Sequence, residues 1–325
     1  MRFHYGSETW SVAGVFRISR GEVTSVETVL VELHDSGSVG RGEGTPYAHF
    51  GWTMKATLES LESVRAAVEK GITREELQEL LPPGAARNAL DCALWDLEAK
   101  KSGEPAWRAA GLESFAPIVT AYTISVDEPA VMAARAAEAS HRPLLKVKMG
   151  GGGDLPRIAA VRQAAPSSGL IVDANEAWDL ETLQTISPQL AELGVQLIEQ
   201  PLPAAEDECL RDYRGPVPLC ADESCRDRSS LDSVVGLYQF INIKLDKTGG
   251  LTEALLLAED ARQRGLQLMV GCMLGTSLAM APGTIIGSQS TFVDLDGPLL
   301  LAEDRVPGIH YEGSVMSPPP SELWG

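Results

Sequence analysis

Eight short apolar runs recur along this chain, and their first residues are 21 to 26 positions apart. The runs span residues 118–124, 144–149, 170–175, 195–200, 219–224, 240–246, 266–273 and 291–296. Ala-rich or amphipathic segments between them predict helices at 129–140, 155–164, 180–193 and 251–264. Short strands that alternate with helices pair in parallel, because parallel strands need a crossover connection. Eight such units predict a closed α/β barrel of the (β/α)8 kind.

The N-terminal third of the chain has a different pattern. Alternating residues on each side of the turn Asp35-Ser36-Gly37 predict a β-hairpin. Apolar residues at helical spacing then predict two helices, one over 53–70 and one over 86–97. Strands followed by helices indicate a separate α+β domain. We expect the following domain boundaries: 1–115 for the α+β domain, completed by the loop-rich 299–325, and 116–298 for the barrel.

Composition narrows the range of partners. The formal net charge is −18, from 27 basic and 45 acidic residues, which disfavours nucleic acid and anionic membranes because both need basic patches. The five cysteines show no regular framework, which is typical of reduced thiols in the cytoplasm. Met1–Arg20 lacks a signal-peptide pattern, and no apolar stretch approaches the roughly 20 residues that span a bilayer. We expect a cytoplasmic protein with a small-molecule partner, and a homo-oligomer is compatible with the sequence.

Charged residues lie near the ends of the central runs, where apolar neighbours would not normally tolerate them. They are Lys146, Lys148, Asp173, Glu199, Asp222 and Lys244. The C-terminal ends of barrel strands form the active-site face, so these side chains are expected to meet there. Burying one unpaired ion costs roughly several kcal/mol, so such a group must compensate its own charges, most simply around a cation.

Three of these residues are carboxylates that close consecutive strands: Asp173, Glu199 and Asp222. Each one alone would be read as an ordinary helix cap. Three on successive strands, with lysines on both sides, predict a metal site instead. Carboxylates without His or Cys partners are hard oxygen ligands that suit Mg²⁺ better than Zn²⁺. Asn175 and Glu223 are then expected to hold the ligands in place.

The lysines flank the carboxylates along the chain. Lys146 and Lys148 share one face of a strand and precede the three acids by one strand, whereas Lys244 follows them by one strand. A base on each side of a metal is the arrangement that a two-base proton transfer needs. A lysine acts as a base when its pKa falls toward neutrality, which a divalent cation and a second ammonium group favour. Lys247 lies past the strand, where a purely structural ion pair is expected.

The chain resembles the enolase superfamily, and within it the muconate-lactonizing-enzyme-like subgroup. Five motifs carry the resemblance: Lys146-Val147-Lys148, Asp173-Ala174-Asn175, Glu199-Gln200-Pro201, Ala221-Asp222-Glu223-Ser224 and Ile243-Lys244. The resemblance implies a (β/α)7β-type TIM barrel with an α+β N-terminal capping domain, whose loops near 16–25 and 45–52 set specificity. It also implies one Mg²⁺ per subunit and an enediolate intermediate, which is the known chemistry of enolase-superfamily sites rather than a result of the spacing.

Within that subgroup the chain is similar to dipeptide epimerases of the L-Ala-D/L-Glu type. The similarity lies in 242–251, in 271–277 and in Asp294-Leu295-Asp296. It implies an isomerase of murein peptide metabolism that inverts the α-carbon of the C-terminal residue of a dipeptide by 1,1-proton transfer. Lys148 and Lys244 would exchange the proton, Lys146 would neutralise the intermediate, and Asp294 and Asp296 would bind the dipeptide ammonium group.

The same resemblance implies further contacts with the substrate. Thr123 matches a substrate-contacting position, Cys272 and Met273 are expected to wall the pocket, and Arg20 is the candidate for the carboxylate of a Glu side chain. The chain departs from this type where His49 replaces an expected Arg, and where Glu22 and Val23 follow Arg20 without another basic residue. These departures leave the side-chain preference open.

Four other interpretations are compatible with parts of the same sequence. An o-succinylbenzoate synthase or an N-acylamino acid racemase would share the lysines and the carboxylates, but neither needs the acidic pair Asp294 and Asp296. Muconate cycloisomerase is less favoured, because nothing in the sequence indicates a lactone pocket. A non-catalytic binding protein would not need both Lys148 and Lys244.

Overall fold

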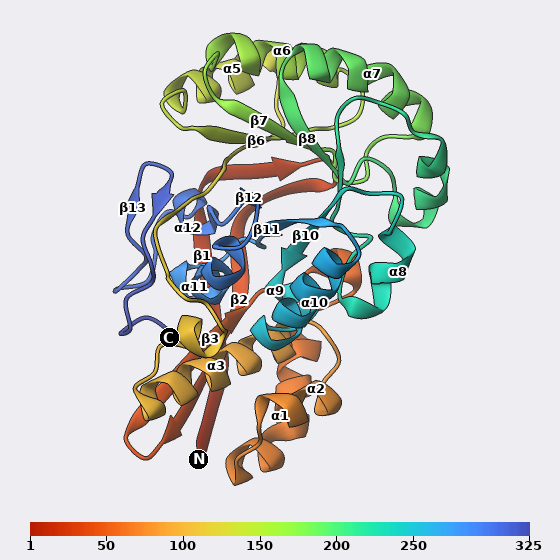
Figure 1. Cartoon of the computed structure of the whole chain (residues 1–325). Helices are drawn as coiled ribbons and strands as arrows, with labels where there is room; N and C mark the ends of the chain where they lie inside the picture. The colour runs from red at the N-terminus through yellow and green to blue at the C-terminus, as the bar shows by residue number, and fades with distance from the viewer.

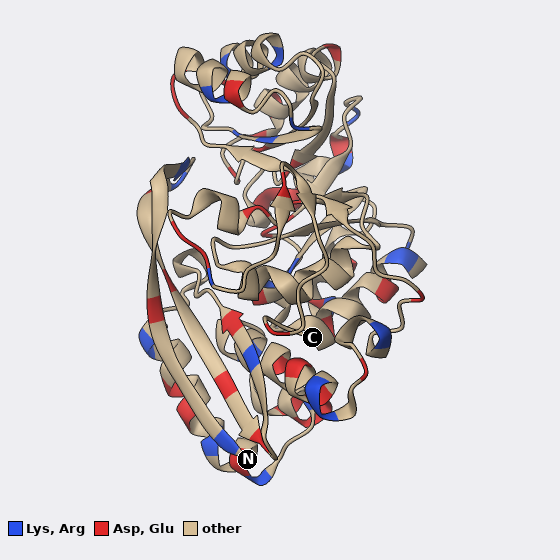
Figure 2. Ribbon diagram, turned by 90° about the vertical axis from the view of Figure 1, so that its left-hand side faces the viewer, with Lys and Arg blue, Asp and Glu red and all other residues tan.

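The computed structural model describes residues 1–325, and the chain begins with a three-stranded antiparallel sheet. Its strands are β1 (Arg2–Ile18), β2 (Gly21–Asp35) and β3 (Ser38–Gly44), in that order. The predicted hairpin corresponds to β2 and β3, and its strands are longer than expected. β1 was not predicted. It pairs with β2 to form a long hairpin arm, which runs from the N-terminus along one side of the molecule up to the barrel (Figures 1 and 2).

Three helices follow the sheet: α1 (Met54–Lys70), α2 (Arg74–Leu80) and α3 (Ala85–Ser102). α1 begins where the Thr53 side chain accepts a hydrogen bond from the amide of Ala56, which satisfies one of the free donors at a helix N-terminus. α3 is buried on nearly all sides because one face joins the core of the N-terminal domain and the other joins the barrel core. β3 lies close to α3, since a Cβ atom on Gly42 would be only 2.0 Å from the carbonyl oxygen of Ala89.

Eight parallel strands in sequence order form the second sheet, as the apolar runs predict. They are β5 (Tyr122–Ile124), β6 (Leu144–Lys148), β7 (Gly169–Asp173), β8 (Val195–Glu199), β9 (Leu219–Ala221), β10 (Phe240–Lys244), β11 (Gln267–Gly271) and β12 (Phe292–Val293). The amide of Ala121, just before β5, donates a 2.7 Å hydrogen bond to the carbonyl of Val293 in β12. This bond joins the two ends of the sheet and closes the barrel.

Each of the seven connections between consecutive strands contains at least one helical segment, so the prediction of a (β/α)7β barrel is confirmed. The four predicted helices are present as α5 (Pro129–Glu138), α6 (Asp154–Ala164), α7 (Leu180–Glu192) and α10 (Leu251–Gln263). The other connections contain a 3-10 segment, η2 (Ala204–Asp212), the short η3 (Arg228–Ser230) and α8 (Leu231–Val234), and α11 (Ser277–Gly287). Helices α5, α6 and α7 cover the outer side of β6, β7 and β8 (Figure 1). No helix combines the length and apolar character needed to cross a membrane.

The C-terminal segment contacts both parts of the chain. Its strands β13 (Tyr311–Glu312) and β14 (Val315–Met316) form a small antiparallel sheet with β4 (Ile118–Val119). The Trp324 indole donates a 2.9 Å hydrogen bond to the carbonyl of Cys92 in α3. The association of 299–325 with the N-terminal domain stays a prediction, because this segment lies against the barrel as well. The remaining short elements are η1 (Ala48–Phe50), α4 (Ala106–Ala109), α9 (Leu245–Thr248) and α12 (Gly297–Leu300).

Candidate active site

The charged residues enter the barrel because strand side chains alternate. Ile171, Leu197 and Cys220 belong to a small apolar cluster that fills the barrel interior. Asp173, Glu199 and Asp222 follow them two residues later, so they point to the same side, one layer nearer the C-terminal end. All three carboxylates are buried, with at most 2% of each residue exposed. An apolar layer therefore lies beneath a charged ring at the mouth of the barrel.

The three predicted lysines lie in this ring, in contact with the carboxylates. Lys148 Nζ donates a 2.6 Å hydrogen bond to Asp173 Oδ2. Lys244 lies in β10, so β7, β8 and β9 separate it from Lys148 in β6. Its Nζ donates a 2.6 Å hydrogen bond to Asp222 Oδ2. Lys146 Nζ lies 3.1 Å from Asp173 Oδ2 and 2.7 Å from Glu199 Oε2. Two ammonium groups therefore flank the acids, and a third lies among them.

Burial and charge move the pKa values of these groups in opposite directions. Burial lowers the pKa of Lys146 and of Lys244, but the neighbouring carboxylates raise both by more, so both lie above their usual value. Burial raises the pKa of Asp222, but Lys244, Lys247 and Lys146 together lower it well below its usual value. Burial and the charge of Asp173 raise the pKa of Glu199 to about 7. The ring's own carboxylates therefore raise the pKa of Lys146 and of Lys244, and for Lys244 this is opposite to the shift expected for a base.

The three carboxylates of the ring form an oxygen donor set for a metal ion. Ammonium groups lie between them, and no three His, Cys, Asp or Glu side chains are placed to hold a metal as they stand. Glu199 Oε2 and Asp222 Oδ1 are nevertheless buried without a hydrogen bond, although lysine Nζ atoms lie 2.7 Å from each. Carboxylate oxygens with unused lone pairs are ligands that Mg²⁺ accepts. The chemistry of this donor set fits a hard divalent cation.

Neighbouring residues hold the acids in place through backbone or side-chain groups, and the sequence predicted only part of this set. The backbone amide of Asn175 donates to Asp173 Oδ1 at 2.9 Å, whereas Glu223 pairs with Arg20 rather than with an acid of the ring. The missed residues include Asn242, whose amide donates to Glu199 Oε1 at 2.8 Å. Asn242 could have been predicted to face the ring, because it lies two residues before Lys244 on the same face of the strand.

Two other residues support Asp222. Gln200 Oε1 accepts a 2.9 Å hydrogen bond from the backbone amide of Asp222, and the Gln200 backbone has φ of 34°. Lys247 Nζ donates to the carbonyl oxygens of Asp222, Cys225 and Asn242 at 2.5 to 2.8 Å. Lys247 therefore ties the loop after β9 to β10, which agrees with the structural role expected for it.

The acidic pair at the eighth strand is also buried. Asp294 Oδ2 accepts a 2.8 Å hydrogen bond from Lys146, while Asp294 Oδ1 has no partner. Asp296 Oδ2 accepts a 2.7 Å hydrogen bond from the backbone amide of Thr123. Burial and the charge of Asp294 raise the pKa of Asp296 to about 7. The pair thus has more negative charge than its protein partners offset, so it suits a cationic ligand group.

A cavity of about 830 Å³ opens above the ring. The predicted residues that line it are Arg20, Thr123, Lys146, Lys148, Asn175, Lys244, Cys272, Met273, Asp294 and Asp296. Its outer wall comes from the hairpin arm and from the cap loop, residues 45–52, so both expected specificity segments border the cavity. Lysines, the acidic pair and two domain segments therefore meet around one space.

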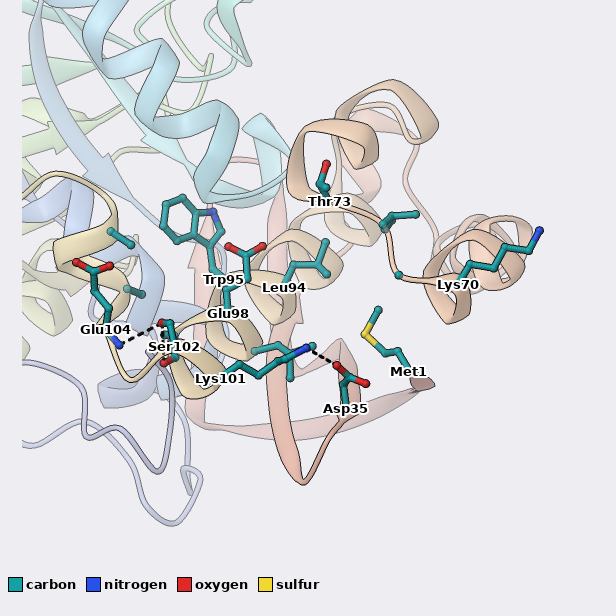
Figure 3. Close-up of a pocket in the computed structure, with 16 residues that line it drawn as sticks. Met1, Asp35, Lys70, Thr73, Leu94, Trp95, Glu98, Lys101, Ser102 and Glu104 are labelled. Atoms are coloured by element: carbon teal, nitrogen blue, oxygen red, sulfur yellow. Dashed lines mark hydrogen bonds and ion pairs between the residues drawn. The ribbon is translucent and has the colours of Figure 1, made fainter.

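A second hollow, of about 720 Å³, lies on the N-terminal domain away from the ring (Figure 3). Trp95, Lys101 and Asp35 are among the residues that line it, and Lys101 forms an ion pair with Asp35. Its charged residues lie at or near the surface, and none of them is buried. The cavity above the barrel is therefore the candidate active site.

Arg20 and His49 lie at the outer edge of the cavity, already in contact with protein groups. Arg20 donates to Glu223 Oε1 and to the Tyr47 hydroxyl, each at 2.6 Å. His49 Nε2 lies 2.9 Å from Glu176 Oε2. A substrate carboxylate would have to share Arg20 with these acceptors.

Comparison with known proteins agrees with this geometry. Residues 4–111 match the N-terminal domain of the mandelate racemase/muconate lactonizing enzyme family, and residues 130–306 match the enolase C-terminal domain-like family. The chain is 45% identical to L-Ala-D/L-Glu epimerase of Escherichia coli, over 94% of this chain and 95% of that protein. It is 44% identical to N-acetyl-D-glutamate racemase of a Pseudoalteromonas species, over 91% and 95%.

Solved structures of enolase family members are also similar to this chain over nearly its full length. An enolase family member from Agrobacterium tumefaciens, with homology to dipeptide epimerases and with bound sodium and L-Ala-L-Glu, is 49% identical, covers 99% of both chains and has a TM-score of 0.98. A dipeptide epimerase from Enterococcus faecalis, complexed with Mg and L-Leu-L-Tyr, is 28% identical over 99% of this chain and 98% of that one, with a TM-score of 0.91. The chain belongs to the mandelate racemase/muconate lactonizing enzyme family of the enolase superfamily.

Proposed function

We propose that this protein is a Mg²⁺-dependent dipeptide epimerase that inverts the α-carbon of the C-terminal residue, with L-Ala-D/L-Glu as the first candidate substrate. One observation carries the proposal. Lys148 and Lys244 are buried amines on opposite sides of the ring, each 2.6 Å from a carboxylate at the end of the neighbouring strand. A substrate α-carbon between them would face one amine on each side, which a 1,1-proton transfer requires.

The proposed reaction assigns a different task to each lysine. In one direction Lys148, as the neutral amine, takes the α-proton, and Lys244, as the ammonium ion, returns a proton to the opposite face. The roles reverse in the other direction. Lys146 stays protonated because the acids around it raise its pKa, so it can stabilise negative charge that develops on the substrate carboxylate. Each step moves a proton only between the substrate α-carbon and one of these two amines.

Asp173, Glu199 and Asp222 would hold the metal ion. When bound, Mg²⁺ would supply Lewis-acid stabilisation of the substrate carboxylate and would offset the negative charge that raises the pKa of Lys244. The hard oxygen donors, and the Mg complex of the related Enterococcus faecalis enzyme, support this assignment. Asn175 and Asn242 would keep two of the acids oriented through their 2.9 Å and 2.8 Å hydrogen bonds.

Asp294 and Asp296 would bind the free amino group of the dipeptide. The Pseudoalteromonas relative, whose sequence identity to this chain is nearly as high as that of the Escherichia coli epimerase, is named for an N-acetyl substrate. An N-acylamino acid is therefore the second candidate substrate. An N-acyl group carries no charge and would leave this buried acidic pair unbalanced, whereas an ammonium group would offset it. The acidic pair therefore favours the dipeptide.

Five free thiols support the expected cytoplasmic location.

The test is proton exchange at the α-carbon. The protein is incubated with Mg²⁺ in D₂O, with a small set of L-Ala-L-Xaa dipeptides and with N-acetyl-glutamate, and the α-proton signal is followed by NMR. We expect exchange and epimerisation of at least one dipeptide, with faster turnover than for the N-acetyl compound. Binding of dipeptides without exchange would contradict the proposal, and exchange of only the N-acetyl compound would replace it with the second candidate.

A further inference from the structure

Glu176 lies at a point where three separate segments meet. It follows Asn175 in the loop after β7, and both residues adopt the left-handed region, with φ of 43° for Asn175 and 65° for Glu176. Positive φ is uncommon at residues other than glycine, so the surrounding contacts must hold this backbone. The Glu176 side chain is 13% exposed.

The carboxylate of Glu176 binds one group from each segment. Oε2 lies 3.2 Å from Arg20 Nη1 in the hairpin arm and 2.9 Å from His49 Nε2 in the cap loop. Oε1 accepts a 2.9 Å hydrogen bond from the backbone amide of Ala204, at the start of η2 in the barrel. One carboxylate thus joins both walls of the cavity mouth to the barrel.

Additional contacts hold the same end of the hairpin arm. The Ser19 hydroxyl and Arg20 Nη1 donate to the carbonyl oxygen of Asn175 at 3.0 and 2.8 Å. Arg20 Nη2 donates to Glu223 and Tyr47. Each terminal nitrogen of the guanidinium group therefore has two protein acceptors. Arg20 fixes the arm in place, and a substrate side chain that reaches this region meets a group whose charge Glu176 and Glu223 already offset.

From this arrangement we infer that Glu176 is a positioning residue that sets side-chain specificity, because it aligns the hairpin arm and the cap loop over the cavity. The inference rests on the proposed function for its substrate. Glu176 itself does not line the cavity and takes no part in proton transfer. Its substitution should therefore change how substrate side chains bind and leave the proton-transfer step nearly intact.

The first test compares Glu176→Gln with Glu181→Gln, an exposed glutamate in the next helix that serves as the control. Glutamine can still accept the Ala204 hydrogen bond but loses the charge that faces Arg20 and His49. We expect KM for the preferred dipeptide to rise about tenfold, the size expected for one charge-assisted hydrogen bond, with kcat within about threefold. We also expect a smaller rise in KM for dipeptides that the wild type binds poorly, so the variant should discriminate less between dipeptides.

Two results would overturn the inference: a fall in kcat with unchanged KM, or equal effects of Glu176→Gln and Glu181→Gln on every dipeptide. A second measurement does not depend on activity. Hydrogen exchange followed by mass spectrometry should show about tenfold faster exchange in both 16–25 and 45–52 of Glu176→Gln, because both segments lose the same partner. Unchanged exchange in either segment would contradict the inference even if the protein acts on no dipeptide, so the two proposals fail separately.

Discussion

Lys244 donates a 2.6 Å hydrogen bond to Asp222, a residue that closes the strand next to its own. The same acid is a proposed metal ligand, so one carboxylate would hold both the base and the cation. Asp222 therefore couples the two, because any charge that draws on its oxygens reduces its stabilisation of the Lys244 ammonium ion. Lys148 and Asp173 repeat this arrangement on the other side of the ring.

Replacing either flanking lysine should abolish epimerisation. Lys148→Ala and Lys244→Ala each remove one of the two proton carriers, so we expect kcat for epimerisation to fall by at least about 10²-fold. Each variant should still exchange the α-proton of one substrate epimer, and the two variants should differ in which one. NMR in D₂O with each pure epimer measures this. Lys55→Ala, on the exposed surface of α1, is the control. Epimerisation by either variant at the wild-type rate would refute the two-base assignment.

Asp296→Asn should weaken dipeptide binding and spare the metal. The substitution removes one of two buried charges that face the proposed ammonium site, while asparagine can still accept the Thr123 hydrogen bond. We expect dipeptide KM to rise by about 10- to 100-fold, with unchanged Mg²⁺ affinity in calorimetry. An N-acetylated dipeptide, which lacks the charge, serves as the comparison and should bind no worse to the variant. Loss of Mg²⁺ affinity would show that Asp296 takes part in metal binding, which contradicts the role proposed for it.

Asp91 in α3 should make stability depend on pH. Burial raises its pKa from 3.8 to about 6, so the folded protein binds a proton there more tightly than the unfolded chain does. The stabilisation is therefore complete below about pH 4 and is lost as pH rises through about 6. At roughly 1.36 kcal/mol per pKa unit, the loss is at most about 3 kcal/mol.

The measurement is urea unfolding of the wild type and of Asp91→Asn, which cannot titrate, between pH 4 and pH 7. The free energy of unfolding of the wild type should fall relative to that of the variant across this range. A constant difference between the two proteins would mean that Asp91 has the same proton affinity in the folded and unfolded states.

Gly42→Ala should destabilise the N-terminal domain. The added Cβ would lie 2.0 Å from the carbonyl oxygen of Ala89, so β3 or α3 would have to move. We expect a loss of about 2 kcal/mol or more in the free energy of unfolding. Gly6→Ala in β1 is the matched control, because no atom lies within 4 Å of its added Cβ, and its effect should stay within about 0.5 kcal/mol. Equal effects of the two substitutions in urea unfolding would contradict this packing argument.

Much of the barrel could be predicted because its signals are local. A strand such as β7 is an apolar run of fixed length, and the alternation from Ile171 to Asp173 already places the acid on the inner face. β1 escaped prediction because it is an edge strand with few buried positions, Phe3 and Val12 among them, so its alternation is weak. The contacts of Glu176 also escaped prediction, since its partners lie 156, 127 and 28 positions away along the chain.

By itself, the sequence determined the strand order, the acids and lysines that reach the barrel mouth, and the family to which the chain belongs. The strands and their charged ends follow from side-chain periodicity, which acts over two to four residues, whereas the family follows from short motifs such as Lys146-Val147-Lys148. Only the tertiary structure decided which ammonium group meets which carboxylate, that Arg20 is already bound to Glu223, and how the hairpin arm and the cap loop meet over the cavity. Such contacts join loops whose separation in sequence carries no information about their distance in space, so packing alone fixes them.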